Sequence, residues 1–379
     1  MLTPPLRRLA LAGAVIGLVP CLLVGPADAA GPRGPSAPLE YLGVTTIPAG
    51  MPFDGTVVGG LSSITYDASR DVYYAVSDDQ GAGFTPTSTP SRFYTLGIDV
   101  SDGSLDAGDV TVLSTTTLLG LDGQPFPAQR LDPEGMTLTP QHTLVVTSEG
   151  IASRRIAPFV REFSLSGQEL RELPVPGYFD PVPPDVGVRN NLGFEAAAVT
   201  PNGQRLVVGT ENALAQDGPA ATTSTTSAAR ILSYHIGHGG SDREYVYVTD
   251  PVVAPSSIFT VNGLVELLPL NKQFMLAMER SFSVGAGNDI RIFRVALPGA
   301  TNVSGVPDLQ DVDRLRPAQK SLLLHLPATV GGQPLDNVEG MTLGPLLPDG
   351  RRAVLMVSDN NFTMSPTPID SQVLLAALG

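Results

Sequence analysis

Acidic residues recur in this sequence at corresponding points of a repeated pattern. In the plainest copies, one acid precedes a short hydrophobic run and a second acid follows the next run, as with Glu134 and Glu149 or Glu195 and Glu211. The full set of such acids is Asp78 or its neighbour Asp79, Glu134, Glu149, Glu195, Glu211, Glu279, Glu339 and Asp359. Carboxylates that gather in one place raise each other's pKa values unless a cation neutralises them. If the fold brings these residues together, they predict a metal site.

The type of donor favours calcium. All the candidate ligands are oxygen donors, and the single cysteine, Cys21, lies in the first thirty residues. Many hard oxygen ligands select Ca²⁺ over Zn²⁺, and even a weak calcium site is filled outside the cell. The alternative is that these acids only solvate the ends of their strands.

Two arginines stand close in sequence to these acids. Arg280 follows Glu279 directly, and Arg155 lies six residues after Glu149. A guanidinium can hold a phosphate through paired hydrogen bonds and can stabilise the charge that develops during phosphoester chemistry. The candidate catalytic residues are therefore Arg280, Arg155 and Glu149. The alternative for each arginine is simple neutralisation of the neighbouring carboxylate.

Other catalytic motifs are absent from the sequence. It contains no Gly-x-Ser-x-Gly elbow, no glycine-rich phosphate loop followed by Lys, no His-Glu-x-x-His and no EF-hand loop. Serine-nucleophile chemistry, nucleotide hydrolysis and zinc proteolysis therefore have no support.

The elements that must position the acids form a long repeat. A pair of hydrophobic runs joined by a turn occurs five times, and each of the first four pairs is followed by two more strand-like runs, such as 92–96 and 110–113. Convincing amphipathic helical stretches are nearly absent. Four antiparallel strands per unit, repeated around a ring, predict an all-β fold of the β-propeller type, and a β-sandwich or a β-helix is the alternative. We count five blades, and six is the alternative because an irregular blade could lie within an insert.

The last unit needs a strand from elsewhere in the chain. Its third strand is expected at 372–375, and the sequence then ends. We expect residues 40–44 to supply the missing fourth strand, because this closure removes the open sheet edges that invite aggregation.

Hairpin geometry explains how distant acids would meet. Glu134 and Glu149 flank one hairpin, and Glu195 and Glu211 flank the next. A hairpin with about six residues per strand returns such positions to the same end. If these hairpins are the innermost strands of their blades, the acids gather at one mouth of the central channel.

The beginning of the chain resembles an export signal. Arg7 and Arg8 precede an apolar run, and Ala27-Asp28-Ala29 forms a small-x-small cleavage site. We expect a signal peptide over 1–29, a flexible Gly/Pro leader over 30–38, and a single propeller domain over 39–379. The protein is therefore expected to be secreted, without an integral membrane span. The net charge of −14 argues against binding to nucleic acid, and we expect a monomer with a small-molecule substrate.

Several ordered motifs carry a family resemblance. They are Asp132-Pro133-Glu134-Gly135-Met136, Thr147-Ser148-Glu149-Gly150, Asn191-Leu192-Gly193-Phe194-Glu195-Ala196, Met278-Glu279-Arg280, Asn337-Val338-Glu339-Gly340-Met341 and Val357-Ser358-Asp359-Asn360-Asn361. In these segments the sequence resembles the phytase-like family of exported bacterial proteins, which is described as having esterase-like activity of phytase. The resemblance covers nearly all of the chain after the leader. It implies a propeller fold, a secreted protein and recurrent functional acids, and looser analogy with propeller phytases and lactonases implies Ca²⁺ at the channel mouth.

Two functions follow as hypotheses. The first is a secreted, calcium-dependent hydrolase of phosphate esters or related esters. The second is a non-catalytic propeller that binds a ligand or partner and holds a purely structural metal. The chain contains only two lysines, so an inositol polyphosphate would need metal ions to bridge it to this acidic surface, whereas a smaller phosphomonoester or phosphodiester remains open.

Overall fold

The computed structural model describes residues 38–81, 89–182, 184–237, 239–363 and 369–379, and every structural statement refers to these residues. The expected signal peptide and nearly all of the expected leader lie outside them and stay predictions. No helix in the described part of the chain is long and apolar enough to cross a membrane.

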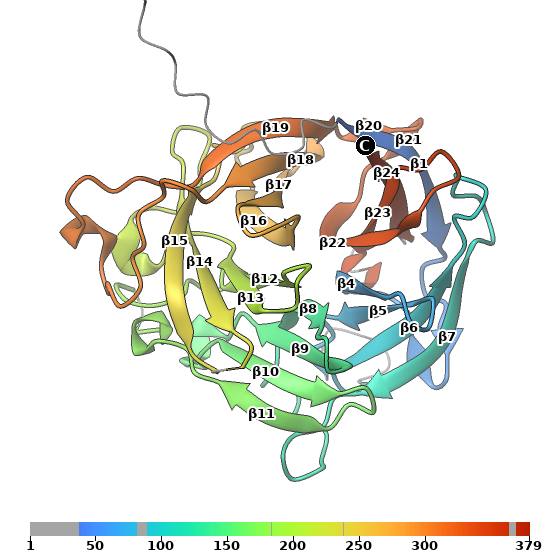
Figure 1. The fold of residues 1–379 in the computed structure, drawn as a ribbon, viewed down its shortest axis with the longest axis horizontal. Helices are drawn as coiled ribbons and strands as arrows, with labels where there is room; N and C mark the ends of the chain where they lie inside the picture. The colour runs from blue at the N-terminus through green and yellow to red at the C-terminus, as the bar shows by residue number, and fades with distance from the viewer. Residues whose placement is uncertain (1–37, 82–88, 183, 238, 364–368) are drawn as a thin grey trace, which may run out of the picture. The chain divides into compact units, whose positions relative to one another are not determined.

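Five four-stranded antiparallel sheets form the blades of a β-propeller (Figure 1). Blade 1 contains β4 (Leu61–Asp67), β5 (Val72–Ser77), β6 (Arg92–Ile98) and β7 (Val110–Thr117). Blade 2 contains β8 (Pro133–Leu138), β9 (Thr143–Ser148), β10 (Phe159–Ser164) and β11 (Glu169–Leu173). Blade 3 contains β12 (Phe194–Val199), β13 (Arg205–Thr210), β14 (Ala228–His235) and β15 (Ser241–Val248). Blade 4 contains β16 (Thr260–Pro269), β17 (Phe274–Ser283), β18 (Gly287–Ala296) and β19 (Gln319–Leu326).

Blade 5 joins the two ends of the described chain. It contains β22 (Asn337–Leu346), β23 (Arg352–Asp359), β24 (Ser371–Leu378) and, as its outermost strand, β1 (Leu39–Ile47). Strands β1 and β24 pair from Leu39 opposite Leu378 to Ile47 opposite Ser371. The predictions of a five-bladed propeller and of closure by the N-terminal strand are confirmed, and the alternative of six blades is wrong for the described residues.

Short elements decorate the connections between strands. Two small hairpins pair β2 (Pro52–Phe53) with β3 (Thr56–Val57) and β20 (Thr329–Val330) with β21 (Gln333–Pro334). The 3₁₀ turns are η1 (Ala152–Arg154), η2 (Gly177–Phe179), η3 (Ala215–Asp217), η4 (Leu309–Asp311) and η5 (Asn361–Thr363).

The hydrophobic core is divided among the five interfaces between neighbouring blades. Each of five buried clusters takes its side chains from two adjacent blades; Tyr74 and Phe93 of blade 1, for example, pack with Leu144 and Phe163 of blade 2. The second strand of a blade is buried on both faces, so it appears in the sequence as a continuous apolar run rather than an alternating one. This pattern made the inner hairpins visible in the sequence.

A buried carboxylate joins all five blades below the mouth of the channel. Glu266 on β16 is 1% exposed and accepts hydrogen bonds from the Ser63 hydroxyl (2.9 Å), from the backbone N–H of Leu267 (2.9 Å), and from the backbone of Met341 and Ala197. The Ser63 hydroxyl also lies 3.3 Å from the carbonyl oxygen of Met136 on blade 2. An ionised carboxylate has about four lone-pair sites, which matches these four donors.

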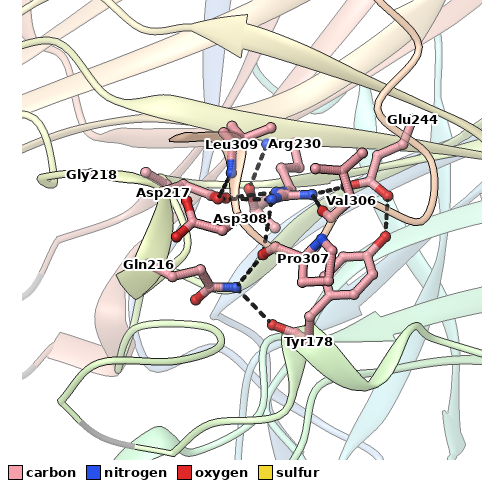
Figure 2. A network of polar contacts seen from close by, with 12 residues as sticks. Tyr178, Gln216, Asp217, Gly218, Arg230, Glu244, Val306, Pro307, Asp308 and Leu309 are labelled. Atoms are coloured by element: carbon pink, nitrogen blue, oxygen red, sulfur yellow. Dashed lines mark hydrogen bonds and ion pairs between the residues drawn. The ribbon is translucent and has the colours of Figure 1, made fainter. Parts of the chain in front are cut away.

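A buried arginine fixes the long loops around blade 3 (Figure 2). Arg230 on β14 donates to both carboxylate oxygens of Asp217 (2.6 and 2.7 Å) and to Glu244 (2.6 Å), and it also donates to the carbonyl oxygen of Val306 (2.9 Å). Tyr178 donates to the other oxygen of Glu244 at 2.6 Å. The network therefore anchors the loop that follows β13, and residues of this loop line the channel mouth.

Candidate functional site

Each innermost strand contains a β-bulge at a corresponding point. The pairing register shifts around Ser62 in β4, Glu134 in β8, Glu195 in β12, Val265 in β16 and Glu339 in β22. A bulge bends the strand and re-aims the side chain that it carries. Three blades use this position to turn a glutamate toward the channel, where Glu134, Glu195 and Glu339 all line one cavity.

Another charged residue lies at or near the end of the second strand of each blade, at the same level of the channel. Asp78, Glu149 and Glu211 each donate a backbone N–H to the inner strand's chain, at Gly60, Asp132 and Gly193. The equivalent residues are Asp359, which pairs with Asn337 in blade 5, and Arg280, which pairs with Gly263 in blade 4. Four blades therefore present an acid at this position and blade 4 presents a base.

A cavity of about 1120 Å³ opens at this end of the channel. Its lining includes ten carboxylates: Asp78, Asp79, Asp132, Glu134, Glu195, Glu211, Asp336, Glu339, Asp359 and Asp370. Arg280 is the only basic side chain among the described residues of the lining.

A glycine on the neighbouring blade leaves room for one of these acids. A Cβ atom on Gly263 of blade 4 would lie 2.2 Å from Cγ of Glu211 on blade 3. No real Cβ atom approaches another atom this closely, so the acid at the end of β13 occupies space that only a glycine on the neighbouring blade leaves free.

Three of the carboxylates are arranged as a metal site would be. Asp132, Glu134 and Glu149 each offer an oxygen atom, and these oxygens all lie within 4.8 Å of one another. Asp132 and Glu134 line the cavity, whereas Glu149 lies behind them, is 2% exposed and accepts a hydrogen bond from the Gly193 N–H at 2.9 Å. The set consists only of oxygen donors, so these residues fit a hard divalent cation.

The pKa values of the site show that its charge is poorly compensated by the protein alone. Burial, followed by the charge of Glu195 and then of Asp132, raises the pKa of Glu134 well above its usual range. Burial also raises the pKa of Asp132 to about 6, and burial together with Glu339 raises that of Asp359 to about 8. A bound cation would reverse these shifts, because it stabilises the ionised carboxylates.

Arg280 compensates part of the charge on the opposite side. Its guanidinium donates to Glu339 at 2.8 Å and lies 3.5 Å from Glu211. Burial raises the pKa of Glu211 to about 7, and Arg280 opposes this shift. The arginine itself keeps its charge, because these carboxylates outweigh the effect of burial on its pKa.

Several buried polar atoms of the cavity lining have no hydrogen-bond partner. Among the described residues these atoms include Oδ1 of Asp78, Oε1 of Glu211 and Nε of Arg280. The Glu211 oxygen has only its 3.5 Å ion pair with Arg280. Buried polar groups are normally satisfied, so an ion or ligand bound at this part of the lining would supply contacts that the protein does not.

The structure brings most of the predicted site residues together. Asp78, Glu134, Glu195, Glu211, Glu339, Asp359 and Arg280 line the cavity, and Glu149 joins the cluster behind it. Asp79, the alternative to Asp78, also lines the cavity and is held by an ion pair with Arg92 at 2.7 Å.

Two predicted residues lie elsewhere. Glu279 is opposite Leu264, one position before Arg280, and its carboxylate accepts hydrogen bonds from Tyr247 (2.6 Å) and Lys320 (2.5 Å) on the flank of blade 4. Arg155 is exposed, follows η1, and is not part of the cavity lining. The structure therefore does not place either residue with the other acids.

Several acids of this region were not among the predicted ligands. Asp336 and Asp370 line the cavity but lie outside the repeated positions. Asp132 lies next to Pro133 and was visible within the Asp-Pro-Glu-Gly-Met motif, but its place opposite Glu149 depends on the register of the hairpin. Glu266 sits within the apolar run of β16 and gave no repeated signal, because the other blades have small residues at this level, such as Ser63 and Gly340.

The chain matches one known protein family over most of its length. Residues 56–362 match the family described as "Phytase-like: Esterase-like activity of phytase". The chain belongs to this phytase-like family. The match confirms the resemblance inferred from the sequence and includes most of the residues that line the cavity. No curated protein matches the chain.

Two solved structures are similar to the chain at low identity. The periplasmic gluconolactonase PpgL of Pseudomonas aeruginosa is 12% identical, with a TM-score of 0.38, and the match covers 90% of this chain and 96% of that one. An endo-arabinase from Bacteroides thetaiotaomicron VPI-5482 is 11% identical, with a TM-score of 0.44, and the match covers 88% of this chain and 97% of that one.

Proposed function

We propose that this phytase-like protein is a calcium-dependent hydrolase of phosphate esters or related esters, and that the reaction takes place in the cavity at the channel mouth. The observation that carries the proposal is the pairing of two unlike groups across one cavity. The carboxylates of Asp132, Glu134 and Glu149 form a cluster of oxygen donors, and the Arg280 guanidinium stands on the blade 4 side. An ester hydrolase needs both a means of activating water and a positive group for the charge that develops.

We assign the metal to calcium because of the number and type of donors. Ca²⁺ takes six to eight oxygen ligands in a flexible geometry. Asp132, Glu134 and Glu149 would hold the ion, and Asp78, Glu195 and Asp359 face the same cavity and are available to complete its coordination. When bound, the ion supplies Lewis-acid polarisation of the ester and lowers the pKa of a bound water.

The protein's own residues do the remaining work. Arg280 is held in place by Glu339 through a 2.8 Å hydrogen bond, and its free Nε–H is available to an oxygen of the substrate. Glu149 does not reach the cavity, so we assign it to holding the cation and positioning Asp132 rather than to contact with the substrate. Arg155 has no role in this scheme, because it is not part of the cavity lining.

Turnover assays test the proposal directly. Purified protein is incubated with a chromogenic phosphomonoester, a phosphodiester and a carboxylic ester, with excess Ca²⁺ or with chelator. We expect hydrolysis of at least one ester, loss of this activity on chelation, and its return when Ca²⁺ is added back. Glu134→Gln should abolish the activity while the protein stays folded, whereas Glu172→Gln, at an exposed carboxylate on β11, should not change it.

The opposite results would contradict the proposal. If none of the three esters is turned over in excess Ca²⁺, the site is not a hydrolase of these classes. If Ca²⁺ then still raises the melting temperature, the result favours a non-catalytic binding propeller with a structural metal.

We further propose that the protein is exported. The basic and apolar pattern of residues 1–29 supports cleavage after Ala29, and calcium is abundant outside the cell. Mass spectrometry of the protein from the culture medium should find a mature chain that begins at Ala30. An intact N-terminus on protein found only inside cells would contradict export.

A further inference from the structure

Blade 4 interrupts the ring of acids. Each of the other four blades places at least one carboxylate at the bulge of its inner strand or at the end of its second strand. Blade 4 has Val265 and Arg280 at these two positions. The wall that blade 4 contributes to the cavity is therefore not acidic, which makes it the side on which an anionic substrate meets the least repulsion.

The same wall continues into an aromatic surface. Phe282 lies two residues after Arg280 on β17, and alternate residues of a strand face the same side. Val261 on β16 is paired with Phe282, and the rings of Phe259 and Phe282 have centroids 6.3 Å apart. Arg280, Phe282, Val261 and Phe259 all line the cavity.

This aromatic surface is incompletely covered. Phe259 is 55% exposed and Phe282 is half-buried. Both rings therefore keep apolar area that a ligand could cover. An exposed apolar patch beside polar groups inside a cavity is typical of a ligand site. Arg280, whose buried Nε–H lacks an acceptor, lines the same cavity, so a charged side chain stands beside the apolar surface.

The charges of the cavity limit the kind of anion that fits. Among the described residues, ten carboxylates line it and one guanidinium opposes them. A phosphate monoester brings at most two negative charges into this acidic cavity, and both can lie between one bound cation and Arg280. A hexakisphosphate would place further phosphates against uncompensated carboxylates.

We infer that Phe259, Val261 and Phe282 form a subsite for the apolar or aromatic alcohol part of a small phosphate monoester whose phosphoryl oxygen accepts a hydrogen bond from Arg280. The substrate class is therefore an aryl or alkyl phosphate and not an inositol polyphosphate. This inference rests on the proposed function, since it assigns the substrate of the same site.

Binding of non-hydrolysable phosphonates tests the subsite without relying on turnover. The affinities of phenylphosphonate, methylphosphonate and inositol hexakisphosphate for the Ca²⁺-loaded protein are measured by calorimetry. We expect phenylphosphonate to bind about tenfold more tightly than methylphosphonate, because the ring buries apolar area against the two phenylalanines. The hexakisphosphate should bind most weakly of the three.

Alanine variants of the two phenylalanines test whether these side chains cause the preference for phenylphosphonate. Phe282→Ala and Phe259→Ala should each reduce the tenfold preference for the phenyl group to about twofold or less, with little change in the affinity for methylphosphonate. Val284→Ala removes a 37% exposed apolar side chain two residues from Phe282, outside the cavity lining, and should leave the preference unchanged. Far-ultraviolet circular dichroism of each variant checks that the fold is retained.

Several outcomes would overturn the inference. They are equal affinities for the two phosphonates, tighter binding of the hexakisphosphate, binding of none of the three, or a preference that survives both phenylalanine variants. Failure of the proposed hydrolase is distinguishable, because it would show as absence of turnover while the phosphonate preference is retained.

Discussion

Arg280 is the only basic side chain among the described residues that line the cavity. It replaces an acid in the repeated pattern, is 8% exposed, and forms its shortest ion pair with Glu339, at 2.8 Å. Without it, Glu211 and Glu339 would be two more buried carboxylates without a positive partner nearby. We therefore expect this residue to affect both the stability of the site and its capacity to bind an anion.

Arg280→Gln should reduce kcat/KM about 100-fold or more, because it removes a charged donor aimed at the reacting group. It should also lower the free energy of unfolding by about 3 kcal/mol, since breaking a buried ion pair leaves its partner uncompensated. Steady-state kinetics and urea denaturation measure the two effects. Arg155→Gln is the control, and it should change neither quantity. An Arg280→Gln variant with unchanged kcat/KM would contradict the role.

The residue before each acid explains why Glu279 was wrongly expected to face the cavity. Ser77-Asp78, Ser148-Glu149, Thr210-Glu211 and Ser358-Asp359 each place a hydroxyl residue before the acid. In blade 4 the corresponding pair is Glu279-Arg280, so the visible acid occupies the place of the hydroxyl. A shift of one residue moves a side chain to the other face of a strand, and hydrophobicity alone does not fix the register. The Ser or Thr that precedes the acid in the other blades could have shown that Arg280, and not Glu279, occupies the position that faces the cavity.

At the scale of the element, the hairpins were predictable and their bulges were not. The second strands of the blades, such as β9 and β13, are continuous apolar runs, and turn residues precede them. The existence of these hairpins therefore followed from the sequence. The bulge at the acids depends on how five inner strands pack against each other around the channel, which is a tertiary effect. The sequence therefore predicted that the acids share one end of the channel, but not which of them face the cavity.

Gly135 tests the importance of this packing. It follows Glu134 at the bulge of β8, and a Cβ atom there would lie 2.5 Å from the carbonyl oxygen of Glu195 and 2.8 Å from the backbone nitrogen of Ala197. Gly135→Ala should therefore lower the free energy of unfolding by about 2 kcal/mol through overpacking. It should also weaken Ca²⁺ binding, because the adjacent Glu134 is displaced.

Gly240→Ala is the matched control for Gly135→Ala. No atom lies within 4 Å of the Cβ position at Gly240, so this change should not alter stability. Denaturation curves that show the same stability for both variants would mean that the inner strands do not pack as tightly as described.

At the scale of the whole molecule, closure and the central carboxylate hold the ring. Strand β1 completes blade 5, which the repeat count predicted because the last unit lacked one strand. Glu266 was not predicted, because its function depends on donors from blades far apart in sequence. Burial raises its pKa well above the usual range, and the converging hydrogen bonds oppose this shift.

Glu266→Gln tests the convergence of the blades. The amide nitrogen of glutamine would face at least one of the N–H donors, so the variant should lose about 2 to 3 kcal/mol of unfolding free energy. Chemical denaturation of Glu266→Gln beside Glu172→Gln measures the difference. Equal stability of the two variants would show that the carboxylate is not required at the axis.

The acids of the cavity also predict how stability depends on pH. In the metal-free protein the pKa values of Asp132, Glu211 and Asp359 are raised to about 6, about 7 and about 8. The folded chain therefore keeps protons that the unfolded chain has lost, so its stability falls as the pH rises from about 4 through about 8. Bound Ca²⁺ stabilises the ionised carboxylates and removes this penalty.

Melting temperatures at pH 5 and pH 8 test this linkage. In chelator, the melting temperature should be lower at pH 8 than at pH 5. The increase produced by Ca²⁺ should be larger at pH 8, where fewer protons compete for the site. An increase of the same size at both values would mean that the ion does not bind to these carboxylates.

Calorimetric titration of the chelated protein with Ca²⁺ at pH 8 measures the capture of a divalent ion directly. The structure predicts at least one ion per chain, bound with release of protons, and a marked loss of affinity in Glu134→Gln but not in Glu172→Gln. A titration without heat of binding, or one that Glu134→Gln leaves unchanged, would contradict a calcium site at the channel mouth.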